Sequence, residues 1–226
     1  MGEGKLEEKE EKKVKLHQGI FLTLEGGEGS GKSTVAKILA DWFRRQGLQV
    51  LLTREPGGIP VAERIRELIV NNEMETMTEA LLFAASRNEI TKQVIEPALA
   101  RGEIVICDRF VDSSFVYQGI VKNLGVELVY QINRPVLERV EPDLTFLLDI
   151  NPLVGLSRIR DNGRETNKFD RENLAFHEKV REGYLSLLKR PEFAKRIRVI
   201  PAEGTSDEVA RVCIEAFSEW YQKRVS

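Results

Sequence analysis

The chain has 226 residues, of which 42% are hydrophobic and 31% are charged, so it can bury a large apolar core as one compact globular domain. Its formal net charge of −2 excludes the basic surplus that draws a whole protein to nucleic acid or to an anionic membrane. The two cysteines, Cys107 and Cys213, show neither a disulfide framework nor metal-ligand spacing. We expect a cytoplasmic protein, because no apolar run could span a bilayer and the N-terminus lacks an apolar signal core.

Residues 1–18 are rich in Glu and Lys and contain few apolar side chains. Such a segment cannot bury enough surface to order itself, so we expect a charged, mobile extension without a chemical role. Its removal should leave activity intact. Residues 19–226 are then expected to form the functional domain.

Short apolar runs alternate with longer segments of helical period, which is typical of a parallel sheet flanked by helices. Strands are expected at residues 20–25, 49–53, 103–108, 144–149 and 198–200. Helices are expected at residues 33–46, 77–100, 171–188 and 207–223, the second with Thr76 or Thr78 as its N-cap and a kink at Pro97. Residues 158–170 carry many charges but no apolar stripe, which predicts a loop or mobile flap.

Residues 26–33, GGEGSGKS, match the phosphate-loop pattern G-x-x-x-x-G-K-[ST] between an expected strand and an expected helix. Glycines let backbone N–H groups turn toward phosphate oxygens, and the helix N-terminus adds its dipole. Lys32 would contact the β- and γ-phosphates of a nucleotide, and the Ser33 hydroxyl would coordinate Mg²⁺. The predicted ATP site comprises Gly26, Gly27, Glu28, Gly29, Ser30, Gly31, Lys32, Ser33 and Thr34.

Four further segments are candidates for an acceptor site: TREPGG at 53–58, FAASR at 83–87, DRFVDSS at 108–114 and YQG at 117–119. Two of them follow expected strands. Ligands of an open parallel sheet bind beyond the carboxyl ends of its strands, so these segments should converge on the phosphate loop.

Together these motifs, with Pro142-Asp143-Leu144 before the fourth strand, resemble the thymidylate kinase family over about residues 19–222. The resemblance implies a P-loop NTPase three-layer α/β sandwich with sheet order 2-3-1-4-5, a lid at about 158–170 and a homodimer. It also implies transfer of the γ-phosphoryl group of ATP to dTMP, with Mg²⁺ as the cofactor and dTDP, on the route to dTTP, as the product.

The resemblance also assigns roles to acceptor-site residues. Arg54 and Arg109 would bind the dTMP phosphate, since a guanidinium offers forked donors. Phe83 would stack on the thymine ring, and Arg87 would donate to a base carbonyl. The remaining predicted contacts are Ser113, Ser114 and Gln118 at the base edge and Tyr117 against the deoxyribose. Some of these residues also have a structural alternative: a surface ion pair for Arg54 and Arg109, a core aromatic for Phe83, and a helix cap for Ser113 and Ser114.

Two carboxylates complete the predicted site. Glu28 would approach the sugar 3′-hydroxyl and act in catalysis, and Asp108 would support the Mg²⁺ hydration shell or orient Arg109. Solvated carboxylates are the alternative for both.

The family differs in where it keeps the arginines that meet the transferring phosphoryl group. This chain has Gly29 in the phosphate loop and its cations, Arg158, Arg160, Arg164 and Lys168, in the expected flap, which resembles the bacterial type. Arg160 and Arg164 are the predicted catalytic pair, and Arg158 is expected near the adenine. A solvated flap charge is the alternative for each.

Two other functions remain open from the sequence. The first is a kinase for another nucleoside monophosphate, such as dUMP, GMP or AMP, which the base pocket would decide. The second is an ATPase switch, which would hydrolyse ATP without an acceptor and would not need the second phosphate site formed by Arg54 and Arg109.

Overall fold

The computed structural model describes residues 19–161 and 167–225, so the extension at 1–18 and Arg164 lie outside the described residues. Its centre is a five-stranded sheet in the order β2-β3-β1-β4-β5, in which every neighbouring pair is parallel. The strands are β1 Ile20–Glu25, β2 Val50–Arg54, β3 Ile104–Asp108, β4 Leu144–Asp149 and β5 Ile197–Pro201. The expected fold class and strand order are confirmed.

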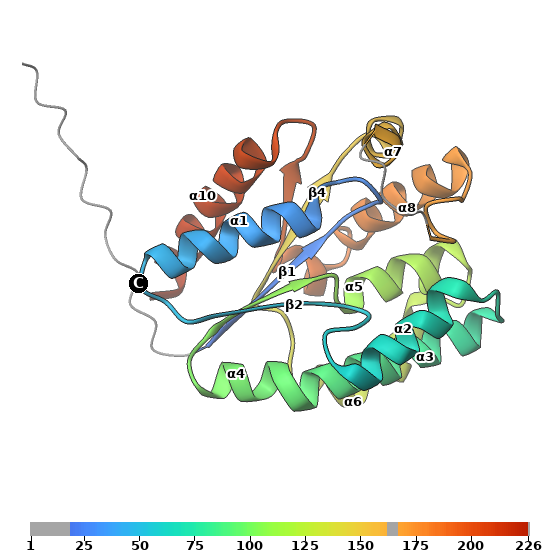
Figure 1. Ribbon diagram of the computed structural model, residues 1–226, viewed down its shortest axis with the longest axis horizontal. Helices are drawn as coiled ribbons and strands as arrows, with labels where there is room; N and C mark the ends of the chain where they lie inside the picture. Colours follow the sequence, from blue (N-terminus) through green and yellow to red (C-terminus); the bar gives the residue numbers. More distant parts are fainter. Residues whose placement is uncertain (1–18, 162–166, 226) are drawn as a thin grey trace, which may run out of the picture.

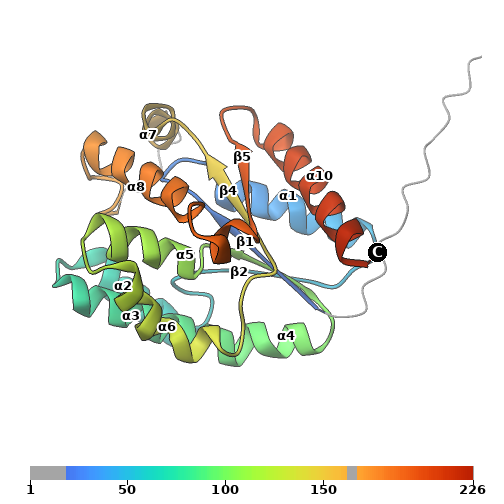
Figure 2. The same ribbon diagram turned by 180° about the vertical axis from the view of Figure 1, so that it is seen from behind.

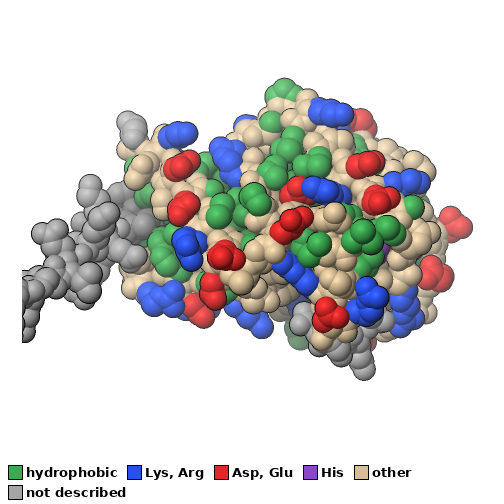
Figure 3. All heavy atoms as spheres, turned by 90° about the horizontal axis from the view of Figure 1, so that it is seen from above, with side chains coloured by type: hydrophobic (Ala, Val, Ile, Leu, Met, Phe, Trp, Pro, Cys, Tyr) green, Lys and Arg blue, Asp and Glu red, His purple; other side chains and the backbone are tan. Residues whose placement is uncertain are grey.

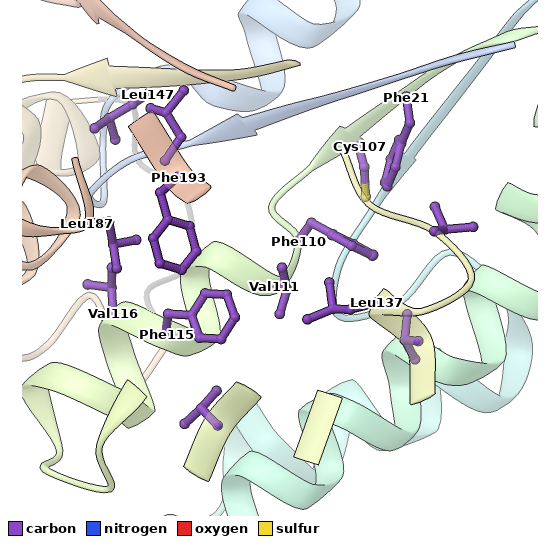
Figure 4. Close-up of a cluster of buried hydrophobic side chains, with 14 of the residues drawn as sticks. Phe21, Cys107, Phe110, Val111, Phe115, Val116, Leu137, Leu147, Leu187 and Phe193 are labelled. Carbon is purple, nitrogen blue, oxygen red and sulfur yellow. The ribbon is translucent and has the colours of Figure 1, made fainter. Parts of the chain in front are cut away.

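Helices cover both faces of the sheet (Figures 1 and 2). Alternate residues of β1 point to opposite faces: Leu22 packs with α1 and α10, and Phe21 packs with the helices of the other face. Figure 4 shows this second cluster, in which Phe21 and Cys107 of the sheet lie near Phe110. Strands buried on both faces read as continuous apolar runs, which is why the sequence predicted them well.

The long helices are α1 Lys32–Arg45, α2 Pro60–Asn71, α3 Thr76–Ile90, α6 Val126–Leu137, α7 Pro152–Asp161, α8 Leu174–Leu187 and α10 Ser206–Val225. Shorter segments are η1 Thr91–Ile95, α4 Glu96–Ala100, α5 Val111–Ser114, η2 Phe115–Val121 and α9 Pro191–Ala194. Within the described parts of the chain, no helix combines the length and apolar character that crossing a membrane requires. Lys, Arg, Asp and Glu side chains are interspersed on the face shown in Figure 3.

Two local predictions were wrong. The flap expected at 158–170 begins as helix, because α7 continues through Asp161 and buries Ile159 one turn after the buried Gly155. The other apolar residues of this helix, Leu153, Val154 and Leu156, precede residue 158, so residues 158–170 alone showed no apolar stripe. The residue that caps α3 is Glu75, not Thr76 or Thr78. The helix expected at 77–100 is present as α3, η1 and α4 in succession, and its π-helical turn, η1, lies just before Pro97, which cannot donate a backbone hydrogen bond.

The carboxyl ends of the strands meet at one edge of the sheet. Asp108 at the end of β3 pairs in register with Leu24 of β1 and with Arg54 of β2. The segments that follow β1, β2 and β3 are the phosphate loop, TREPGG and DRFVDSS, so the sheet brings the predicted donor and acceptor motifs together.

Candidate active site

A cavity of about 890 Å³ opens at this edge of the sheet. One end is lined by the phosphate loop and the loop between β5 and α10, and the other by the end of β2, by α3 and by α5 with η2. Most of the predicted site residues line it: Glu28, Gly29, Gly31, Lys32, Ser33, Thr34, Arg54, Phe83, Arg87, Asp108, Arg109, Ser113, Ser114, Tyr117, Gln118 and Arg158.

Lys32 is buried in the phosphate loop, where its Nζ donates to the carbonyl oxygens of Gly26 at 3.0 Å and Gly27 at 2.8 Å. It also donates to Ser30 Oγ at 3.2 Å. Burial, together with the nearby charge of Arg109, lowers the pKa of Lys32 to about 8. The ammonium group is therefore fixed inside the loop at the N-terminus of α1, where an anion would lie.

Ser33 Oγ donates a hydrogen bond to Asp108 Oδ2, which joins the phosphate loop to the end of β3. A hydroxyl and a carboxylate are hard oxygen ligands of the kind that Mg²⁺ prefers. The described residues contain no cluster of three or more His, Cys, Asp or Glu side chains suited to an all-protein metal site. The pair fits a metal that is held partly by nucleotide phosphates and water, and this is how Mg²⁺ usually binds.

Arg109 is the central cation of the end of the cavity that is predicted to bind the acceptor. Its side chain is 16% exposed, and Nη2 lies 2.7 Å from Glu28 Oε1. Burial alone would lower the pKa of Arg109, but Glu28, Tyr117, Tyr184 and Glu25 together outweigh it, and the pKa lies well above its usual value. The residue adopts a φ of 71°, the left-handed region that non-glycine residues rarely occupy, so the fold holds this arginine in place at the expense of backbone strain.

Tyr117 lies beside this ion pair. Its hydroxyl donates to Glu28 Oε1 at 3.1 Å and accepts from Arg109 Nη2 at 3.4 Å. The Arg109 guanidinium also lies 5.2 Å from the centre of the Tyr117 ring. Burial raises the pKa of Tyr117 well above its usual value, so the hydroxyl stays neutral. The phosphate loop, the end of β3 and η2 therefore meet at one polar cluster.

Glu25, at the end of β1, has no predicted role but accepts hydrogen bonds from residues of this cluster. Its fully buried carboxylate accepts hydrogen bonds from Phe110 N at 2.8 Å, Ser113 Oγ at 2.6 Å and Tyr184 Oη at 2.9 Å. Burial, with a further contribution from the charge of Asp112, raises the pKa of Glu25 to about 7. Ser113 thus serves as a link between Glu25 and Arg109, to which it is bonded at 3.0 Å.

Arg87 is 1% exposed and lines the cavity beside Phe83, where the base is predicted to bind. Its guanidinium donates to Glu55 Oε2 at 2.7 Å, to Asn133 Oδ1 at 2.6 Å and to Ser114 Oγ at 3.1 Å. Burial raises the pKa of Glu55 to about 7, although the charge of Arg87 opposes that shift. Glu55 and Asn133 are partners that sequence reasoning missed, because they lie 32 and 46 residues from Arg87.

Arg54 differs from Arg109 in being exposed. It is bonded to Glu63 Oε1 at 2.8 Å and to the carbonyl oxygen of Pro56 at 3.0 Å, and it lines the rim of the cavity. The surface ion pair considered for Arg54 is therefore present, and its contact with a phosphate stays a prediction.

The structure separates the cations that were grouped in the flap. Arg158 lines the cavity and donates to the carbonyl oxygens of Ala202, Glu203 and Gly204 in the loop after β5. Arg160 is exposed on α7 and is not among the residues that line the cavity. Lys168 instead donates to Glu79 Oε2 at 2.7 Å. The catalytic roles of Arg160 and Arg164 stay predictions.

Gly29 lies against α7 at very close range. A Cβ on Gly29 would lie 2.0 Å from the carbonyl oxygen of Gly155, and the residue has a φ of +74°. A Cβ on Gly155 would in turn lie 2.4 Å from the carbonyl oxygen of Glu28. The phosphate loop and α7 therefore have no room between them for a side chain at position 29.

Comparisons with known proteins agree with this geometry. The family model described as thymidylate kinase matches residues 24–212. A thymidylate kinase of Geobacillus thermodenitrificans is 50% identical over 195 residues, which cover 84% of this chain and 86% of that relative. A thymidylate kinase of Geobacillus sp. strain WCH70 is 46% identical over 211 residues, covering 92% and 100% respectively.

The fold also matches a solved structure. The crystal structure of thymidylate kinase from Ehrlichia chaffeensis has a TM-score of 0.71 and 31% sequence identity, with 88% of this chain and 99% of that chain covered. The family model, the curated relatives and this solved structure agree, and the chain belongs to the thymidylate kinase family.

Proposed function

We propose that ATP binds at the Lys32 end of the cavity and dTMP at the Arg109 end, in the arrangement needed for the family's reaction. The enzyme transfers the γ-phosphoryl group of ATP to dTMP and releases ADP and dTDP. The observation that carries the proposed arrangement is that Lys32 and Arg109 are two fixed cations lining one cavity. A single-site ATPase needs only the first of them.

The residues supply positioning and charge, and no covalent enzyme intermediate is required. Lys32, the loop N–H groups and the N-terminus of α1 would bind the β- and γ-phosphates. Arg109 and Arg54 would bind the phosphate of dTMP. Glu28 lies beside Arg109 and would accept a hydrogen bond from the sugar 3′-hydroxyl.

The base and sugar would occupy the far end of the cavity. Phe83 would stack on the thymine ring, Arg87 would donate to a base carbonyl, and Ser114 and Gln118 would contact the base edge. Tyr117 would pack against the deoxyribose and leave no room for a 2′-hydroxyl. Ser113 lines the same wall, bonded to Arg109.

Mg²⁺ is part of the proposal. Ser33 and Asp108 would hold it, and a bound Mg²⁺ would neutralise charge on the β- and γ-phosphate oxygens. Arg158 would contact the adenine end, and Arg160 and Arg164 would meet charge on the transferring group when the segment after α7 approaches ATP. An arginine in that role accelerates phosphoryl transfer by about a thousandfold or more.

A cytoplasmic homodimer is also proposed. Apolar side chains that are 38% to 52% exposed lie on three helices that are neighbours in the fold: Val61 and Leu68 on α2, Met77 and Leu81 on α3, and Leu128 and Tyr130 on α6. A second copy would cover them. Size-exclusion chromatography with light scattering should give twice the mass of one chain. Cys107 and Cys213 are free thiols, as suits a reducing compartment.

One assay tests the proposed arrangement. ADP release is measured with ATP alone and with dTMP, dUMP, dCMP, GMP or AMP added as acceptor, each over a range of concentrations. We expect little release without an acceptor and the highest kcat/KM with dTMP. Equal release without an acceptor would identify an ATPase, and a higher kcat/KM for another monophosphate would place a different base in the pocket.

A further inference from the structure

Glu79 is a buried charge beside the proposed base site that the reaction itself does not use. It lies on α3, one turn before Phe83, and is 0% exposed. Its Oε1 accepts from Gln118 Nε2 at 2.9 Å and from Lys122 Nζ at 2.8 Å, and its Oε2 accepts from Lys168 Nζ at 2.7 Å. Burying a carboxylate costs free energy unless it is paired, and the lysines supply that pairing. The two lysines do not explain why the Gln118 amide also donates to this carboxylate.

The charge on Glu79 settles the orientation of that amide. Burial would raise the pKa of Glu79, but the hydrogen bonds from Lys122, Lys168 and Gln118 outweigh it and the pKa lies below its usual value. An ionised carboxylate only accepts hydrogen bonds, so the NH₂ group of Gln118 must face it. A flipped amide would bring two oxygens together. The lysine on Oε2 holds the other half of the carboxylate, so neither group is free to rotate.

Gln118 is 1% exposed and lines the cavity together with Ser114 and Phe83. With an Nε2 hydrogen bonded to Glu79, the amide oxygen Oε1 is held away from the carboxylate and is the hydrogen-bond acceptor that Gln118 offers a ligand. Within residues 19–161 and 167–225, no group donates to this oxygen. Arg87, which lines the same end, is a donor. The base end therefore offers a fixed donor and a fixed acceptor.

That combination matches one pyrimidine and opposes another. Thymine presents the O4 acceptor next to the N3–H donor, whereas cytosine presents an amino donor at position 4 next to an unprotonated N3 acceptor. We infer that Glu79 is a positioning residue that holds the Gln118 amide with its oxygen toward the base, so that the pocket selects thymine over cytosine. This inference rests on the proposed placement of dTMP.

The same carboxylate also organises the wall beside the base. Lys168 and Lys122 lie 5.2 Å and 5.5 Å from the centre of the Phe169 ring, and that ring packs edge-on against Tyr117 at 5.8 Å. A change at Glu79 can therefore alter the shape of the pocket as well as the amide, and the experiment must separate the two effects.

The test measures the KM for dTMP and the inhibition constant of dCMP at saturating ATP, in wild type and in Glu79→Met and Glu79→Gln. Glu79→Met frees the amide to rotate. We therefore expect the ratio of the dCMP inhibition constant to the dTMP KM to fall about tenfold or more, with the KM for ATP unchanged. Glu79→Gln retains an oxygen that can accept from Gln118, so most of the selectivity should return. An unchanged ratio in Glu79→Met would overturn the inference.

Two further variants locate any failure. Lys122→Met removes an ion-pair partner of Glu79 but leaves the bond to Gln118, so the ratio should stay at its wild-type value. If the ratio falls as far as it does in Glu79→Met, Glu79 acts only by stabilising the local structure and the inference is wrong. Gln118→Met should lower the ratio as Glu79→Met does. If it changes neither constant, the proposed placement of the base is itself wrong. Should Glu79→Met not fold, Glu79→Asp, with its carboxylate withdrawn by one methylene, takes its place with the same expectation.

Discussion

Arg109 Nη2 lies 2.7 Å from Glu28 Oε1, so an ion pair joins the end of β3 to the phosphate loop inside the cavity. The two residues are 81 positions apart in the chain. Their contact brings the proposed acceptor phosphate and the proposed donor phosphates within one polar cluster. It also explains why Arg109 tolerates a φ of 71°: Glu28, Ser113 and Tyr184 hold its guanidinium in this position.

Replacing Arg109 with methionine should remove the main cation for the acceptor phosphate. A charge-assisted pair between Arg and phosphate is worth several kcal/mol in a largely buried site, so kcat/KM for dTMP should fall by about a hundredfold or more. Steady-state kinetics with each substrate varied in turn measures this. The KM for ATP should change much less. Arg134→Met, which removes an exposed arginine paired with Glu138, is the matched control and should behave as wild type.

The affinity for ATP should depend on pH through Lys32. The folded-state pKa of about 8 lies below the ordinary value of 10.5, so the folded protein loses this cation as the pH rises through 8. ATP binding uses the cation, and the dissociation constant measured by titration calorimetry should therefore increase above pH 8. Lys32→Met should bind ATP weakly at every pH and lack this dependence. If the dissociation constant of Lys32→Met still increases above pH 8 as it does in wild type, another group causes the pH dependence.

The same shift has an opposite consequence for folding. Between pH 8 and 10.5 the unfolded chain binds more protons at Lys32 than the folded chain does, so this group's contribution to the free energy of unfolding rises with pH there. Below pH 8 both states carry the charge, and its burial is destabilising. Urea unfolding at pH 7 and pH 10 should show a smaller loss of stability at high pH in wild type than in Lys32→Met.

Gly29→Ala should impair catalysis because the new Cβ would meet the carbonyl oxygen of Gly155 at 2.0 Å. The phosphate loop would have to move from α7, and we expect kcat to fall by about tenfold or more, since small misplacements at a reacting centre are costly. Gly47→Ala is the matched control: its φ of +81° is similar, but a Cβ there meets nothing within 4 Å. It should lose about 1 kcal/mol of stability and keep its kcat. Equal kcat in both variants would contradict the prediction.

Arg196 and Asp112 form a buried pair that anchors the acceptor segment to the sheet. Both guanidinium contacts are 2.6 Å long, and Asp112 is 0% exposed. Arg196→Met leaves an uncompensated buried carboxylate, so the free energy of unfolding should fall by about 3 to 5 kcal/mol. Urea denaturation measures it. The double variant Asp112→Leu/Arg196→Met should lose less than the single variant, because no charge is left unpaired.

Local patterns determined much of this protein. The bounds of β1 and β4 were predicted to the residue, because both faces of these strands are buried and their sequences are mainly apolar, each ending in a carboxylate. The phosphate loop was predicted because its chemistry needs particular residues at fixed spacing. Helix α2, by contrast, was not predicted, although Pro60 begins it and Val61, Ile65 and Leu68 recur at helical spacing.

The tertiary structure decided which side chains support those motifs. Glu25 accepts from Tyr184, 159 residues away, and Glu79 accepts from Gln118 and Lys168, 39 and 89 residues away. No local period or motif encodes such pairs. They exist because parallel strands bring distant segments to one edge of the sheet, where a buried carboxylate needs several donors at once. The sequence therefore determined the fold and the kind of chemistry, and the packing of distant segments decided how each reacting group is held.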